Sequence, residues 1–250
     1  MESKTTDAQS QPTRRRYGDG KVRPMAAWQA LRNLIKDPDD TSQVFEIIDS
    51  LAGRSFEKSF KRFRRSPNGP RLIEEQPDIV ESLNDREALA AMPAGSLGRA
   101  YLDFVIREEL TPEGLSSASK EFDHDPAAPK GAYWFGARLR DTHDLHHVLT
   151  GYNRDLVGEA ALLAFTWAQT RNRGIGAIVL MAYVRAGEGN PAARGMIRKG
   201  YRRGRKAAWF PEQDWEALLS QPLDEVREQL RLGDLPQYDE VRSEGAPALA

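Results

Sequence analysis

The chain of 250 residues contains no cysteine, which excludes disulfides, cysteine nucleophiles, iron–sulfur clusters and thiolate zinc sites. A bound metal would therefore need histidine or carboxylate ligands. Only four histidines are present, and three of them, His143, His146 and His147, lie close together in one short segment. This clustering is the most informative feature of the composition.

Long apolar runs are missing as well. The longest, residues 175–184, is about half of the roughly 20 residues that a membrane-spanning helix needs. The segment 1–16 contains almost no apolar side chain, so we expect neither a signal peptide nor an amphipathic transit helix. These absences predict an intracellular protein that at most lies on the surface of a bilayer.

Charge is almost balanced overall, at −1, but it is distributed unevenly. Residues 1–36 carry +5 and residues 194–206 carry +7, so the rest of the chain carries −13. Such asymmetry predicts an anionic partner for the basic segments, either a membrane surface or a phosphate, although a solvated basic face is the simpler interpretation. The acidic remainder would repel a duplex, so we expect no nucleic-acid partner.

Period-two alternation, which would indicate strands, is also absent over any useful length. No glycine-rich phosphate loop and no GxSxG motif occurs, whereas apolar residues recur at helical spacing. We therefore expect a mostly α protein with a single helical-bundle domain over residues 22–236. A disordered tail over 1–21 and a flexible tail over 237–250 would flank this domain.

The segment HDLHH places His143 and His147 at positions i and i+4, hence on one face of a helix. Two imidazoles so placed can converge on one metal ion, and Asp144 can add a carboxylate from the same edge. The alternative is an ordinary helix that happens to carry two histidines.

Glu159 supplies a fourth candidate ligand if the chain folds back. On one unbroken helix it would lie about 18 Å from His147. The sequence instead predicts two helices, 133–149 and 153–170, joined at Gly151, with Asn153 capping the second. This helical hairpin would bring Glu159 level with His147. Two imidazoles and two carboxylates suit a divalent transition metal, with Zn²⁺ favoured and Fe²⁺, Mn²⁺ or Co²⁺ as alternatives.

These residues form the pattern HDxxH-x11-E, which resembles the metal motif of the coenzyme Q biosynthesis protein 4 family of ubiquinone biosynthesis. Residues 93–101 are similar to that family's "lPdGtLGreY" segment. Residues 204–207, 215–216 and 223–230 are similar to its C-terminal end. The resemblance covers about residues 70–232 in the family's order and is weak before residue 70.

The resemblance implies a metal-dependent carboxy-lyase, or oxidative decarboxylase, that acts on a polyprenylated aromatic lipid. The C1 carboxyl group of a polyprenyl-hydroxybenzoate would leave, with a hydroxyl taking its place, and His143, Asp144, His147 and Glu159 would be the metal ligands. It also implies a peripheral membrane protein that forms homodimers and complexes with other ubiquinone-biosynthesis proteins. Because residues 1–20 look like no mitochondrial targeting sequence, we expect a bacterial, cytoplasmic protein on the inner membrane.

Two features have competing interpretations. His146 is an extra histidine beside the motif, which is either a catalytic proton donor or a solvated surface side chain. The apolar run 175–184 is either the wall of a lipid tunnel or a buried core helix.

Two other functions compete with the decarboxylase. One is a non-catalytic scaffold that binds metal and isoprenoid lipid and organises biosynthetic proteins at the membrane. The other is an HD-type phosphohydrolase, which the shortage of further histidines disfavours.

Overall fold

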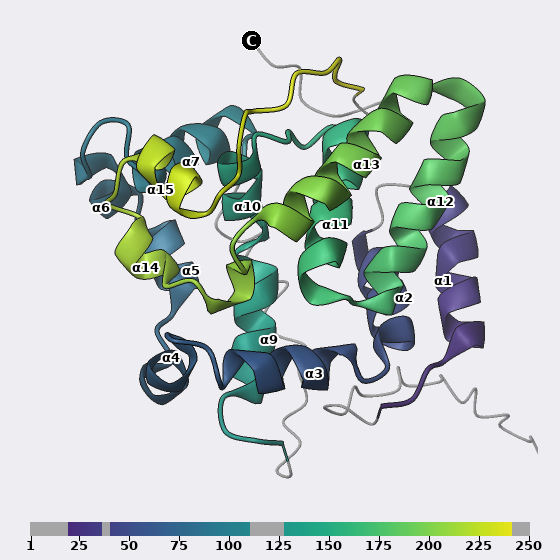
Figure 1. Cartoon of the computed structure of the whole chain (residues 1–250), viewed down its shortest axis with the longest axis horizontal. Coiled ribbons are helices and arrows are strands. Elements are labelled where there is room, and N and C mark those ends of the chain that lie inside the picture. Colours follow the sequence, from purple (N-terminus) through teal and green to yellow (C-terminus); the bar gives the residue numbers. More distant parts are fainter. Residues whose placement is uncertain (1–19, 37–40, 111–127, 242–250) are drawn as a thin grey trace, which may run out of the picture.

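The computed structural model describes residues 20–36, 41–110 and 128–241 (Figure 1). These residues form helices and contain no named strand, which confirms the prediction of a mostly α protein. The helices are α1 Pro24–Lys36, α2 Thr41–Ala52, α3 Ser55–Phe63, α4 Gly69–Glu75, α5 Ile79–Asn84, α6 Arg86–Ala91, α7 Leu97–Arg107, α9 Ala132–Asp141, α10 His143–Thr150, α11 Leu156–Thr170, α12 Arg173–Gly189, α13 Pro191–Lys206, the 3-10 helix η1 Phe210–Glu212, α14 Trp215–Leu218 and α15 Leu223–Gln229.

The predicted tails fall largely outside the described residues, which exclude 1–19 and 242–250. The described part of the predicted C-terminal tail, residues 237–241, contacts the start of α11. Among the described residues, no helix combines the length and the apolar character needed to cross a bilayer.

Among the described residues, helices α11 and α13 have the most extensive contact of any helix pair, and they lie at the centre of the molecule (Figure 1). Two glycines of α13 make this approach possible. A Cβ atom at Gly200 would lie 2.2 Å from the carbonyl oxygen of Ala161, and one at Gly204 would lie 2.5 Å from that of Phe165. Because these two glycines are at i and i+4, they form a groove along α13 into which the backbone of α11 fits.

The apolar run 175–184 lies in α12, which packs against α2, α11 and α13. Ile175, Ile178 and Val179 are buried, whereas Leu180 is 62% exposed and Val184 is 51% exposed. The run is therefore a core helix on one face only. Its other face presents apolar side chains at the surface.

A second core, made of aromatic rings, joins α3 to α9. Phe56, Phe60 and Phe63 recur on one face of α3 and all contact Phe135 of α9, with ring centroids 5.8, 5.5 and 4.6 Å away. Such aromatic pairs add to the burial of apolar area. This packing fixes the direction of α9, which leads directly into the segment with the clustered histidines.

Candidate metal centre

The clustered histidines begin a helix of their own. The predicted helix 133–149 is interrupted at Thr142, so that α9 ends at Asp141 and α10 begins at His143. Within α10 the rings of His143 and His147 lie on one face, with centroids 4.8 Å apart. One ligand atom from each of His143, Asp144 and His147 can be chosen so that all three lie within 4.8 Å of one another. The predicted convergence of these three side chains is thus present.

Gly151 ends α10 and turns the chain back, as predicted. Its φ of +71° is left-handed, and a Cβ atom there would lie 2.8 Å from Leu235. Both facts require glycine at this position. The predicted cap of the next helix is wrong, however. The cap is Asp155, whose carboxylate accepts from the N–H groups of Val157 and Gly158 at 2.9 and 3.3 Å, so α11 begins at Leu156.

The predicted capping residue, Asn153, is bound by the C-terminal segment instead. Its N–H donates to the hydroxyl of Tyr238 at 2.9 Å, and that hydroxyl donates to Asp155 at 2.7 Å. The N–H of Val241 donates to the same carboxylate at 3.1 Å. Residues that the sequence assigns to a flexible tail therefore hold the start of α11 in place.

Glu159 lies in the first turn of α11 and faces the two histidines across the hairpin. Its Oε1 atom is 3.3 Å from Nε2 of His147, and its Oε2 atom is 3.8 Å from Nε2 of His143. Asp144 lies on the other side of His143, with 3.6 Å between Oδ1 and Nδ1. The structure thus brings together all four residues that the sequence nominates as metal ligands.

His147 is held in the tautomer that metal binding requires. Its Nδ1–H donates to the carbonyl oxygen of Tyr152 at 2.8 Å, so its Nε2 atom faces Glu159 and can bind a metal once it is unprotonated. That Nε2 atom is buried and has no hydrogen-bond partner. A buried nitrogen without a partner is costly unless an ion or ligand completes its bonding.

The spacing of the ligand atoms also fits a metal. In a tetrahedral site with bonds of about 2.0–2.1 Å, neighbouring ligand atoms lie about 3.4 Å apart. The two separations that involve Glu159, 3.3 Å to Nε2 of His147 and 3.8 Å to Nε2 of His143, bracket this value and are long for hydrogen bonds. Asp144 contacts the other nitrogen of His143, so it would bind the same ion only after a small movement of its side chain or of the ring. The residues present therefore fit a divalent metal ion, and the geometry leaves the identity of the metal open.

The two carboxylates of the cluster are ionised at neutral pH. Burial opposes ionisation of Glu159, but the nearby His147 and His143 outweigh burial and lower the pKa of its carboxyl group. Burial opposes ionisation of Asp144 too, and His143 outweighs it, so this pKa is also lowered. Two carboxylate charges beside two imidazoles make a site that favours a divalent cation.

The cluster is closed on one side and open on the other. The His147 side chain is fully buried and stacks on Phe104 of α7, with ring centroids 5.8 Å apart. The side chains of His143 and Glu159 are 37% and 34% exposed. A substrate could therefore reach the cluster past His143 and Glu159.

His146, the predicted catalytic residue, is buried among aromatic side chains. Its ring packs edge-on against Phe210 at 4.9 Å and lies 5.6 Å from that of Trp215. The alternative of a solvated surface histidine is wrong, because the residue is only 7% exposed. Burial lowers the pKa of His146 to about 3, so its ring is neutral at pH 7.

Sequence reasoning gave no role to Tyr101 of α7, which lies near enough to Asp144 of the cluster to feel its charge. Tyr101 is fully buried, and its hydroxyl has no hydrogen-bond partner. Burial, followed by the charge of Asp144, raises the pKa of this phenol. The only sequence signal is its place at the end of the motif-like segment 93–101.

Comparison with known proteins adds evidence that the geometry does not contain. The sequence profile of a family described as "Coenzyme Q (ubiquinone) biosynthesis protein Coq4" matches residues 22–236, a span that includes the whole cluster. A protein from Nostoc punctiforme with a known crystal structure superposes with a TM-score of 0.61 over 86% of this chain and 100% of its own. At 22% identity, this likeness supports the fold alone.

Three named relatives are similar over different shares of their length. The chain is 28% identical to "Ubiquinone biosynthesis protein COQ4 homolog, mitochondrial" of Danio rerio over 81% of this chain and 73% of the relative. It is 30% identical to "Ubiquinone biosynthesis protein coq4, mitochondrial" of Schizosaccharomyces japonicus over 67% and 69%, respectively. The match to the Yarrowia lipolytica protein of the same description is 37% identical but spans 42% of this chain and only 38% of the relative.

Proposed function

The chain belongs to the Coq4 family of coenzyme Q (ubiquinone) biosynthesis proteins, which gives it a role in ubiquinone biosynthesis, and we propose that it fills this role as a metal-dependent oxidative decarboxylase. The substrate would be a 4-hydroxy-3-polyprenylbenzoate. Its C1 carboxyl group would leave as carbon dioxide while a hydroxyl group takes its place. This exchange is a two-electron oxidation of the ring, for which an external oxidant is the co-reactant.

One observation carries the proposal: Glu159 lies directly across the hairpin from the Nε2 atom of His147. That buried atom has no hydrogen-bond partner. Together with His143 and Asp144, these residues would hold a divalent metal, with Zn²⁺ as the first candidate and Fe²⁺, Mn²⁺ and Co²⁺ as alternatives. When bound, such a metal supplies a Lewis acid that stabilises charge on the substrate's carboxylate and phenol oxygens.

The chain's own residues would orient the substrate and restrict water. Phe104 and the buried His147 close one side of the cluster, so the benzoate ring would enter from the side of His143 and Glu159. Tyr101 has a buried, unpartnered hydroxyl near Asp144 that could donate a hydrogen bond to a substrate oxygen. His146 stays a predicted proton donor. Because its ring is neutral at pH 7, it would act through an N–H hydrogen bond and not as an imidazolium.

A groove between α11, α12 and α13 suits the polyprenyl chain of this substrate. It has a volume of about 520 Å³, and apolar side chains, among them Trp167, Val179 and Leu180, form much of its surface. Arg198 and Arg202 also line it and could bind an anionic group. Trp167 lies on the same helix as Glu159, about 12 Å further along the helix axis, so a lipid with its ring at the metal could extend toward the groove.

We also propose that the protein associates with an anionic membrane surface through α13. Within the basic segment, Arg194 and Arg203 are used internally, because they donate to backbone carbonyls of α12 and α10. The exposed Arg198, Lys199 and Arg202 have no carboxylate within ion-pair distance among the described residues. Each cation near an anionic bilayer contributes about 1 kcal/mol to binding.

The decisive experiment measures carbon dioxide released from carboxyl-labelled 4-hydroxy-3-polyprenylbenzoate by the purified protein. We expect turnover in the wild type and its loss in Glu159→Gln and His147→Ala. His124→Ala would be the control, because His124 is the one histidine that lies outside the clustered segment 143–147 of the sequence. Circular dichroism would establish that each variant is folded.

The same experiment decides between the enzyme and the non-catalytic scaffold. If folded, metal-free Glu159→Gln converts the substrate at the wild-type rate, the catalytic proposal is wrong. A metal- and lipid-binding protein that organises other ubiquinone-biosynthesis proteins would then be the better interpretation. For His146, loss of turnover in His146→Gln with full metal content would support its predicted role.

A further inference from the structure

Helix α3 has a strongly basic face that the proposed function does not use. Residues 54–65 contain six lysines and arginines but only one acidic residue, Glu57, in a chain whose net charge is −1. Because the three phenylalanines of α3 are packed against α9, the cations must lie on the opposite side of the helix. A solvated basic face would be enough to explain why the cations lie opposite the phenylalanines.

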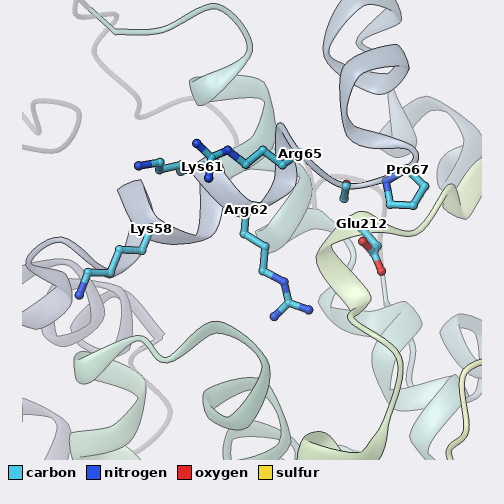
Figure 2. Close-up of a pocket in the computed structure, with 7 residues that line it drawn as sticks. Lys58, Lys61, Arg62, Arg65, Pro67 and Glu212 are labelled. Carbon is cyan, nitrogen blue, oxygen red and sulfur yellow. The ribbon is translucent and has the colours of Figure 1, made fainter.

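Four of these cations line a hollow and not a convex surface. Figure 2 shows Lys58, Lys61, Arg62 and Arg65 along α3 and the turn that follows it, with Glu212 on another segment beside them. Ser66, Pro67 and Glu212 complete the lining of a pocket of about 500 Å³. The pocket thus joins two segments that are far apart in the sequence.

The wall of the pocket is fixed by hydrogen bonds. The Ser66 hydroxyl donates to the carbonyl of Phe63 at 2.7 Å and accepts from the N–H of Gly69 at 3.2 Å. The Asn68 amide donates to the backbone carbonyl of Glu212 at 3.1 Å, which ties the turn to η1. The hollow is therefore preformed, so a ligand would not have to order these segments.

The four cations have no close carboxylate partner. No ion pair within 4.0 Å joins Lys58, Lys61, Arg62 or Arg65 to another described residue, whereas the buried Arg138 forms a bidentate pair with Glu216. Arg62 is nevertheless held in place, because its guanidinium lies 4.0 Å above the Trp209 ring. A preoriented guanidinium loses less conformational entropy when it binds an anion.

We propose that this pocket binds a phosphate group that carries at least two negative charges. Guanidinium and ammonium groups recognise phosphate oxygens through charge-assisted hydrogen bonds, and a dianion would offset part of the charge of the four unpaired cations. The phosphate belongs either to a lipid headgroup or to a soluble phosphate compound. Glu212 opposes a purely anionic ligand by repulsion, so its charge sets how tightly such a ligand binds.

The test uses two probes and the full-length protein. Calorimetric titration with inorganic pyrophosphate measures binding of a soluble phosphate. Flotation with phosphatidylcholine vesicles that contain phosphatidic acid, whose phosphomonoester can carry two negative charges, measures binding of a lipid headgroup. The pocket variant is K61Q/R62Q/R65Q. Its matched control is R32Q/R185Q/R231Q, which removes the same charge from exposed positions elsewhere on the surface.

We expect the pocket variant to weaken binding of at least one probe by more than about tenfold, while the control changes it less than about twofold. The probe that is affected identifies the source of the phosphate. For pyrophosphate, Glu212→Gln should strengthen binding severalfold, because an isosteric change removes the repulsion. The proposal is overturned if neither probe binds, or if the pocket variant loses no more affinity than the control. Pyrophosphate binding at the metal centre would be recognised because it would not depend on the α3 cations.

Discussion

The Nε2 atom of His147 lies 3.3 Å from Oε1 of Glu159, although the two residues belong to different helices and are separated by a complete reversal of the chain. The imidazole of His147 is oriented by its hydrogen bond to the backbone carbonyl of Tyr152, and Tyr152 belongs to the segment in which the chain reverses. The turn at Gly151 therefore supplies both the approach of Glu159 and the tautomer of His147. The hairpin and the candidate metal site therefore form together.

Replacing Glu159 should remove the metal without unfolding the protein. We expect wild-type protein to bind one divalent transition metal per chain and Glu159→Gln to bind it more than about tenfold more weakly, since the variant keeps the shape but loses the charge. Glu81→Gln, at an exposed position of α5, is the matched control. Native mass spectrometry and elemental analysis would measure the metal content. Full occupancy in Glu159→Gln would show that Glu159 is not a ligand.

Gly151→Ala should destabilise the hairpin. A side chain at a φ of +71° is strained, and its Cβ atom would meet Leu235 at 2.8 Å, so we expect a loss of about 1–3 kcal/mol in the free energy of unfolding. The control is Gly195→Ala in α13. A Cβ atom there meets nothing within 4 Å and should stabilise its helix by about 0.5–1 kcal/mol. Urea denaturation measures both changes, and equal effects would contradict the argument.

Arg227 holds the C-terminal end of α10. Its guanidinium donates to the carbonyl oxygens of Leu149 and Val148 at 3.2 and 2.9 Å. These oxygens lie in the last turn of α10 and have no partner within the helix. Arg227→Met should therefore lower the free energy of unfolding by about 2 kcal/mol. It should also loosen the metal site. Arg205→Met, which removes an exposed cation of α13, should change stability by less than about 0.5 kcal/mol in the same thermal and chemical denaturation measurements.

The variant Tyr101→Phe distinguishes a structural role of the Tyr101 hydroxyl from a role in binding substrate. The hydroxyl is buried without a partner, so its removal should leave the free energy of unfolding within about 1 kcal/mol of wild type. If the hydroxyl binds substrate, turnover should fall about tenfold while the metal content stays constant. Denaturation, elemental analysis and the carbon dioxide assay distinguish these effects. A clearly larger loss of stability would instead indicate a structural partner for the hydroxyl.

Local sequence determined much of this protein. Helical spacing of apolar residues specified a helical protein, and the i, i+4 spacing specified that His143 and His147 share a face. Glycine at position 151 specified the reversal, because only glycine adopts its backbone conformation without strain. Each of these features depends on a few neighbouring residues, which is why it is readable in the sequence.

Tertiary structure decided the rest. Asp155, and not Asn153, caps α11, and the side-chain amide of Asn153 instead donates to Glu240 of the C-terminal segment. His146 became a buried neutral ring because Phe210 and Trp215, from a much later part of the chain, pack on it. The pocket beside α3 exists because Glu212 lies near a distant helix. Burial, pKa and pocket shape depend on contacts between segments far apart in the chain, and local periodicity carries no information about them.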